Sequence, residues 1–113
     1  MAAYQGTYYA ISIKLKSSAD GEFVDVTGWE FKADIRLDRR DTETLLELTT
    51  SNGGFVVTDG PGGKFEFRLT AEQTAALPLG KLVFDVLRTD VDPGPVYVFG
   101  ASFRVKQPVT RDG

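Results

Sequence analysis

Hydrophobic and polar residues alternate in several short stretches of this chain. The clearest stretch is WEFKADIRLD, residues 29–38, in which charged residues separate the members of an apolar row. The row consists of Trp29, Phe31, Ala33, Ile35 and Leu37. Because successive side chains of a β-strand point to opposite faces, this pattern predicts a strand with one buried face and one face in water.

Apolar rows with the same period recur along the chain. They are Tyr9, Ile11, Ile13 and Leu15; Phe65, Phe67 and Leu69; and Tyr97, Phe99, Ala101, Phe103 and Val105. Weaker strand candidates lie at residues 22–26, 45–49 and 55–59, and turn sequences such as SNGG and DGPGG separate the stretches. We therefore predict an all-β, antiparallel β-sandwich of about seven or eight strands rather than a parallel α/β fold.

A short helix is predicted between two of the strands, near residues 71–77. Thr70 and Gln73 have the spacing of a capping box, in which each side chain bonds to the backbone N–H of the other residue. Pro78 ends the helix, because the residue before a proline is disfavoured in the α-helical region. We expect Leu77 and Leu79 to close one end of the sandwich.

The composition excludes several classes of chemistry. We expect one domain over residues 1–113. The absence of Cys and His rules out disulfides, thiolate sites, Ser-His-Asp catalysis and the usual zinc sites. No other group of residues has the spacing of a catalytic, cofactor or metal site. We predict a protein that is not an enzyme and has no cofactor.

Charge and hydropathy narrow the choice of partners. The net charge is −3, whereas nucleic-acid-binding domains usually present a basic face, so we do not expect nucleic acid as a partner. No apolar run approaches the roughly 20 residues that span a bilayer, and the sequence does not open with a signal-peptide pattern. We expect synthesis in the cytoplasm of a cell and no membrane partner.

Several segments are similar to those of a known group of modules. These segments are Gly28-Trp29, GKFEFRLT (63–70), GKLVFDV (80–86), FRV (103–105) and VTR (109–111). In this order the chain resembles small immunoglobulin-like modules in virion proteins of tailed bacteriophages, such as the N-terminal domains of baseplate upper proteins. The resemblance implies an immunoglobulin-like form of the predicted sandwich.

The resemblance also implies a function in the virion. Baseplate upper proteins usually continue into a further part, whereas this chain stops soon after Arg111. We therefore expect a tail or baseplate adaptor that docks other virion proteins in a symmetric, multi-copy assembly. Two alternatives stay open: a decoration protein on the capsid, and a carbohydrate-binding module for host-surface glycans.

Candidate interface residues lie in loops and near the chain ends. Arg39 and Arg40 belong to the charged run LDRRDTETLLE, which is either a solvated loop or a docking surface. Tyr4 and Tyr8 are expected to be exposed aromatics that cover a neighbouring subunit or bind a sugar. Arg111 completes the set, and residues 1–8 and 106–113 are predicted docking arms.

Overall fold

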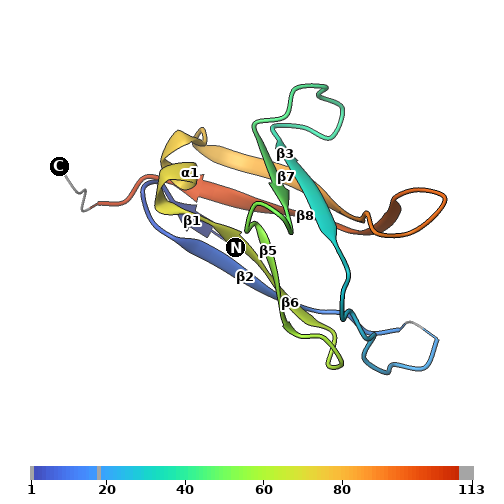
Figure 1. Cartoon of the computed structure of the whole chain (residues 1–113). Helices are drawn as coiled ribbons and strands as arrows, with labels where there is room; N and C mark the ends of the chain where they lie inside the picture. Colours follow the sequence, from blue (N-terminus) through green and yellow to red (C-terminus); the bar gives the residue numbers. More distant parts are fainter. Residues whose placement is uncertain (1, 18, 110–113) are drawn as a thin grey trace.

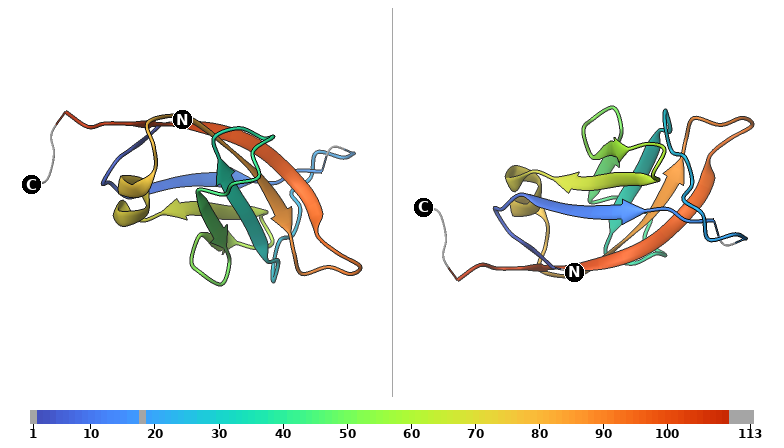
Figure 2. Two further views of the ribbon diagram at one scale, coloured as in Figure 1. Left: turned by 90° about the horizontal axis from the view of Figure 1, so that it is seen from above. Right: turned by 90° about the horizontal axis from the view of Figure 1, so that it is seen from below.

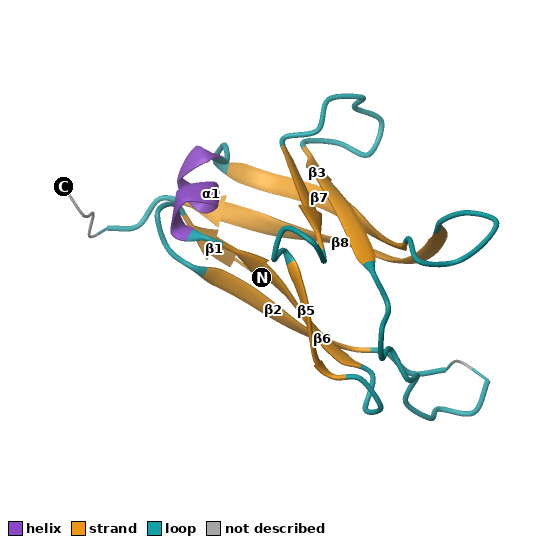
Figure 3. Ribbon diagram, in the orientation of Figure 1, coloured by secondary structure: helices purple, strands orange, loops and turns teal. Residues whose placement is uncertain are grey.

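The computed structural model describes residues 2–17 and 19–109, and its strands form two sheets packed face to face (Figure 1). The elements, coloured by type in Figure 3, follow one another in chain order. They are β1 (Ala2–Tyr4), β2 (Tyr9–Lys14), β3 (Phe31–Arg36), β4 (Leu46–Thr49), β5 (Phe55–Asp59), β6 (Lys64–Leu69), α1 (Ala71–Ala76), β7 (Gly80–Arg88) and β8 (Val96–Lys106).

The strand order is that of an immunoglobulin-like sandwich. One sheet has the order β1-β8-β7-β3-β4 and the other the order β2-β6-β5. Thus β2, β6 and β5 take the places of immunoglobulin strands B, E and D, and β3, β7 and β8 take those of C, F and G. One strand pair departs from the predicted antiparallel arrangement, because β1 runs parallel to β8. The predicted fold class is otherwise confirmed.

Aromatic rings from both sheets fill the core. Phe31 of β3 stacks on Phe65 of β6, with ring centroids 4.3 Å apart. Phe67 of β6 stacks on Phe84 of β7 at 4.6 Å. All four rings are almost completely buried. The predicted apolar rows that contain Phe31 and Phe65 therefore meet between the two sheets, as the alternation of apolar and polar residues indicated.

Helix α1 begins where the sequence predicted. The Thr70 side chain accepts from the Gln73 N–H at 3.1 Å, and the Gln73 side chain accepts from the Thr70 N–H at 2.9 Å. Leu77 is buried at the end of the helix, but Leu79 is 54% exposed, so the prediction that both leucines close the sandwich was wrong for Leu79. Leu79 precedes β7, whose buried residues begin at Leu82.

Two strand predictions were also too long. Strand β3 ends at Arg36, and the chain then turns so that the Asp41 N–H donates to the Asp38 carbonyl at 3.0 Å. Leu37 therefore leaves the inward row and is 54% exposed. The predicted strand at residues 22–26 is reduced to an isolated bridge between Lys16 and Phe23.

The two long sides of the sandwich are built differently. On one side the chain passes directly from β4 to β5, and thereby from one sheet to the other. On the other side, the edge strand β2 faces β8, as the two views of Figure 2 show. The connection from β1 to β2 crosses this second side at only one end. The second side is thus the more open one.

Candidate interaction surfaces

The outer face of the five-stranded sheet carries a row of carboxylates. In the strand register, Glu47 of β4 lies opposite Asp34 of β3, which in turn lies opposite Asp85 of β7. Like charges directly opposite one another destabilise a sheet unless they are compensated. This row therefore requires basic partners on the same face.

Each of the three carboxylates has such a partner. The pairs are Lys32 with Glu47 at 3.6 Å, Arg36 with Asp34 at 3.2 Å, and Arg39 with Asp85. Lys32 and Arg36 come from β3 itself, whereas Arg39 reaches back from the loop after β3. All of these side chains are partly exposed, so the pairs organise the face more than they stabilise the fold.

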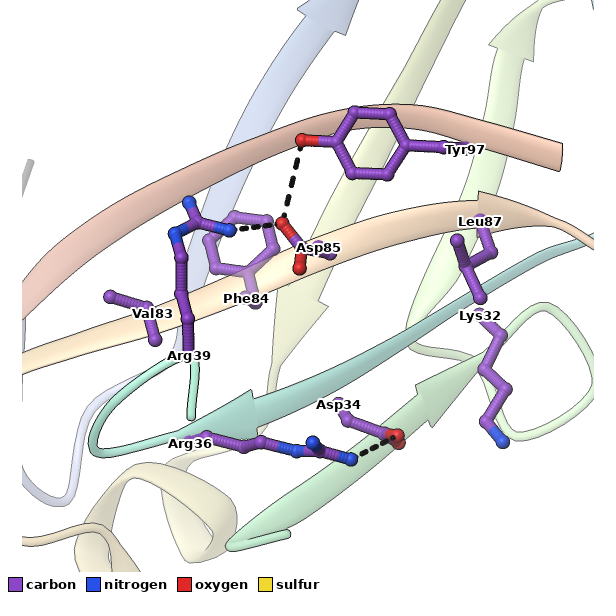
Figure 4. A pocket seen from close by; sticks show the side chains of 9 residues that line it. All are labelled: Lys32, Asp34, Arg36, Arg39, Val83, Phe84, Asp85, Leu87 and Tyr97. Atoms are coloured by element: carbon purple, nitrogen blue, oxygen red, sulfur yellow. Dashed lines mark hydrogen bonds and ion pairs between the residues drawn. The ribbon is translucent and has the colours of Figure 1, made fainter. Parts of the chain in front are cut away.

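Arg39, Asp85 and Tyr97 form a cluster at the centre of this face, which we call the Arg39 cluster (Figure 4). Arg39 donates to Asp85 Oδ1, and the Tyr97 hydroxyl lies 3.5 Å from the same oxygen. The hydrogen bond and the negative charge of Asp85 raise the pKa of Arg39. The guanidinium is therefore held, fully charged, beside an aromatic ring that is itself 59% exposed.

Gly100 makes room for the Arg39 cluster. It lies opposite Asp85 in the register of β7 and β8. A Cβ atom at this position would lie 2.4 Å from Asp85 Oδ1, 2.8 Å from the Tyr97 hydroxyl and 2.9 Å from an Arg39 nitrogen. Only glycine therefore allows the three side chains to close over the strand as they do.

The position of Tyr97 corrects a sequence prediction. The alternation placed Tyr97 in the inward row of β8, together with Phe99. In the structure Val86 pairs with Phe99 but Leu87 pairs with Tyr97, so the register shifts by one residue. A shift of one residue turns every following side chain to the other face. Tyr97 therefore points outward with Leu87 and joins the Arg39 cluster.

A depression of about 220 Å³ lies beside the Arg39 cluster. Val83, Leu87 and Tyr97 contribute apolar surface to its lining, and the charged pairs surround it. Within the described part of the chain, two buried side-chain polar atoms have no hydrogen-bond partner, Asp34 Oδ1 and Arg36 Nε. The exposed part of this face combines Arg, Tyr and apolar surface, which is the composition of a protein-binding surface.

The structure separates Arg39 from its sequence neighbour Arg40. The Arg40 side chain is 96% exposed, and its one ion pair with a described residue is with Asp38, at 3.9 Å. Arg39 instead folds over β7 to Asp85. The charged run therefore contributes one residue to the cluster, and Arg40 stays in the solvated loop.

The other predicted interface residues lie elsewhere. Tyr4 is 44% exposed and lies opposite Lys106, six residues beyond Gly100 on β8 and thus roughly 20 Å away along the strand. Tyr8 is 60% exposed and directly precedes β2. Arg111 lies outside the described residues. The sequence-predicted residues are thus not gathered in one site.

The predicted N-terminal docking arm is partly built into the domain. Ala2–Tyr4 pairs with β8, and Ala3 is completely buried. The Gln5 side chain donates to the Leu77 carbonyl at 2.8 Å, and the Thr74 hydroxyl donates to the Thr7 carbonyl at 2.7 Å. Residues 2–7 therefore lie against the fold rather than free of it. Docking through residues 1–8 and 106–113 stays a prediction.

Arg88, the last residue of β7, lies over Trp29. Its guanidinium lies 3.9 Å from the centre of the Trp29 ring and donates to both carboxylate oxygens of Asp90, at 2.9 and 3.1 Å. These hydrogen bonds lower the pKa of Asp90 to about 2. Trp29 precedes β3 rather than lying in the strand, but it packs against the core, as its place in the inward row predicted, and lies under this ion pair.

Among residues 2–17 and 19–109, no group of three or more acidic, His or Cys side chains could hold a metal ion. The described part of the chain also has no helix that is long and apolar enough to cross a membrane. No model of a known protein family matches this sequence, and a comparison with curated proteins finds no match either.

Proposed function

We propose that this protein is a non-enzymatic structural module that docks other proteins in the virion of a tailed bacteriophage, as an adaptor in the tail or baseplate. The phage context rests on the segments between Gly28 and Arg111 that resemble phage immunoglobulin-like modules. The docking role is supported by the outer face of the five-stranded sheet.

The Arg39 cluster carries this proposal. Tyr and Arg are the residues most enriched where binding energy concentrates in protein interfaces. Here the Arg39 side chain is half exposed and bonds to Asp85, and the Tyr97 hydroxyl lies 3.5 Å from the same carboxylate. Because the bond to Asp85 already orients Arg39, less conformational entropy is lost when a partner covers this side chain. The adjoining depression accepts a side chain of that partner.

Incorporation into particles tests the proposal. Mass spectrometry of purified phage particles should find the chain in stoichiometric amounts, and its absence would reject the virion role. Arg39→Glu should abolish incorporation, because it reverses a charge at the centre of the cluster. An exposed ion pair contributes little to stability, so this variant should still fold.

Arg40→Glu is the matched control. It makes the same charge change one residue away, in a side chain that is 96% exposed and outside the cluster. Docking through this face is supported if particles incorporate Arg40→Glu normally but do not incorporate Arg39→Glu. Equal incorporation of both variants would remove the Arg39 cluster from the proposal.

Two other functions have their own tests. Electron microscopy of intact particles would locate a decoration protein on the capsid rather than in the tail. A glycan array would reveal a carbohydrate-binding module, for which the exposed Tyr8 ring is the stacking surface. Specific binding that is lost in Tyr8→Ala would favour that function over the adaptor.

A further inference from the structure

The open side of the sandwich is bordered by two unpaired strand edges. Among residues 2–17 and 19–109, strand β2 is the last strand of its sheet and pairs only with β6. Strand β8 pairs with β1 only from Arg104 to Lys106, so the edge that precedes Arg104 has no strand partner within the described chain. Such edges present rows of backbone donors and acceptors.

The backbone groups on the free edge of β2 can be identified. The Leu15 N–H donates to Gly63, on the side of β6, at 2.9 Å. Because N–H and C=O groups of alternate residues point to opposite sides of a strand, the odd-numbered residues of β2 bond to β6. Ala10, Ser12 and Lys14 therefore direct their N–H and C=O groups to the free side. All three are exposed.

An apolar seam lies between the two edges. Its lining consists of Tyr9, Ile11, Ile13 and Leu15 from the β2 side and Val98, Phe99 and Ala101 from β8, all only partly buried. On the neighbouring strand β6, the inward residues Phe65 and Phe67 are completely buried. The inward row of β2 is thus left incompletely covered, although its side chains are those of a core strand.

The seam is closed at one end and hollow at the other. At the closed end, Tyr9 stacks on Phe103 with ring centroids 5.7 Å apart. At the other end, Leu15 and Val98 line a cavity of about 270 Å³, with Val24 and Trp29 in its wall. Val96, Tyr97, Lys16 and Arg88 complete its lining, and its size is sufficient for one large apolar side chain.

Two lysines lie at the end of β2 that borders the open end of the seam, and the Lys14 side chain belongs to the exposed row on the outer face of its sheet. Lys14 and Lys16 place their ammonium groups 5.7 and 5.0 Å from the centre of the Phe23 ring, which is 45% exposed. Neither lysine forms an ion pair with a described residue, in contrast to Lys32, which pairs with Glu47 across the outer sheet face. A ligand with a carboxylate at this end would complement the charge.

We propose that the free edge of β2 accepts an extended strand from another protein. The added strand has apolar side chains at alternate positions that cover the seam, one of them in the cavity, and a carboxylate beside Lys14 and Lys16. Antiparallel pairing is the more stable form, so the acidic end is the N-terminal end of the guest strand. This inference rests on the proposed docking function and adds a second contact surface to it.

The charge selects a different protein rather than a second copy of this chain as the guest. The segment from Tyr9 to Lys16, YAISIKLK, contains two lysines and no acidic residue. A second β2 strand paired at this edge would bring two further lysines and no carboxylate. It would therefore leave the positive end of the seam without a complement.

A synthetic peptide tests the strand acceptor. The peptide has two glutamates at its N-terminus followed by alternating valine and threonine, and binding is followed by calorimetry and by amide hydrogen exchange. We expect saturable binding, and the amides of Ser12 and Lys14, which point to the free edge, should exchange more slowly when the peptide is bound. The same peptide with N-terminal lysines should bind more weakly, and Lys14→Glu with Lys16→Glu should reverse this preference.

Ser12→Pro and Ser12→Thr form a matched pair of variants. Proline removes the N–H of Ser12 on the free side, breaks no bond to β6, and is tolerated at strand edges. Threonine keeps that N–H. We expect both to fold, with thermal midpoints close to wild type, and Ser12→Pro to bind the acidic peptide roughly tenfold more weakly or not at all, whereas Ser12→Thr binds normally.

Three outcomes would overturn the inference: no binding to the wild type, equal binding by Ser12→Pro and Ser12→Thr, or self-association of the wild type through this edge in place of peptide binding. The variants also separate this inference from the proposed function. If the peptide does not bind, but the Arg39→Glu variant no longer enters particles, only the strand-acceptor inference is rejected. If the acidic peptide binds in a way that depends on Ser12, but purified particles do not contain the chain, only the virion role is rejected.

Discussion

The two long sides of the sandwich differ in what completes them. On the β4 and β5 side the chain itself crosses between the sheets, and Leu48 and Phe55 beside the crossing are at most 1% exposed. On the β2 and β8 side the corresponding residues, such as Ile11 and Phe99, remain partly exposed. The comparison indicates that local sequence completes one side, whereas the other side has the side chains of a core and leaves them partly exposed.

The crossing is held by hydrogen bonds within a few residues. The Asn52 side-chain oxygen accepts from the Thr49 and Gly54 N–H groups, at 2.9 and 3.1 Å, and its amide nitrogen donates to the Glu47 carbonyl at 3.1 Å. Asparagine is favoured in such turns because its side chain replaces missing backbone partners. The open side has no comparable crossing near Ile13, so nothing local draws the two sheets together there.

The largest effect is expected on the closed side, from Phe55→Ala. Phe55 is 1% exposed and lies 5.5 Å from both Phe31 and Phe67 between ring centroids. Truncation of a buried phenylalanine usually costs about 3–5 kcal/mol, as lost burial and a residual cavity. Chemical denaturation should show a loss of this size, and a loss below 1 kcal/mol would mean that the closed side is not packed as described.

A smaller effect is expected from Gly54→Ala at the same crossing. A Cβ atom on Gly54 would lie 2.6 Å from Leu48 Cβ and 2.9 Å from its Cδ2. Overpacking of this kind typically costs about 1–3 kcal/mol in the free energy of unfolding. Gly94→Ala is the control, because no heavy atom lies within 4 Å of the Cβ position there. Equal stability of the two variants would contradict the tight crossing.

Ile11→Ala on the open side should cost less than either core change. Ile11 faces inward but is only partly buried, so its truncation removes less apolar area from the core and the neighbours can relax toward solvent. We expect a loss of about 1 kcal/mol by chemical denaturation. A loss as large as that of Phe55→Ala would show that the seam is closed in solution.

Local patterns predicted much of the fold. Alternation over Phe31, Ala33 and Ile35 placed a strand correctly, and the spacing of Thr70 and Gln73 predicted the start of α1. These features depend on residues that are adjacent in sequence. They could be predicted because the period of side-chain directions and the cap of a helix are set within a few residues.

The Arg39 cluster could not be predicted in the same way. It needs the register that sets Asp85 beside Gly100, and the shift that turns Tyr97 outward. Both depend on strand pairing, and the sequence contains no local signal for either. The neighbours Arg39 and Arg40 were equivalent in the sequence, and only the position of Asp85 across the sheet distinguishes them.

The smallest effect concerns the charge at the open end of the seam, where Arg88 and Trp29 line the cavity. The hydrogen bonds from Arg88 lower the pKa of Asp90 from 3.8 to about 2. A carboxyl whose pKa is lower in the folded state contributes stability above the unfolded pKa and loses it as the pH falls through the folded pKa. The contribution of Asp90 should therefore be complete above pH 3.8 and disappear toward pH 2.

An NMR titration of the Asp90 carboxyl carbon measures this pKa directly, and the difference in thermal midpoint between wild type and Asp90→Asn should vanish over the same pH range. Arg88→Gln is the control, because it removes the positive charge and the bidentate hydrogen bonds, so the pKa of Asp90 should rise toward 3.8. A wild-type value already near 3.8 would mean that Arg88 is not fixed on Asp90. The wall of the cavity would then be mobile, and the open side would require its guest strand to order that end as well as to cover it.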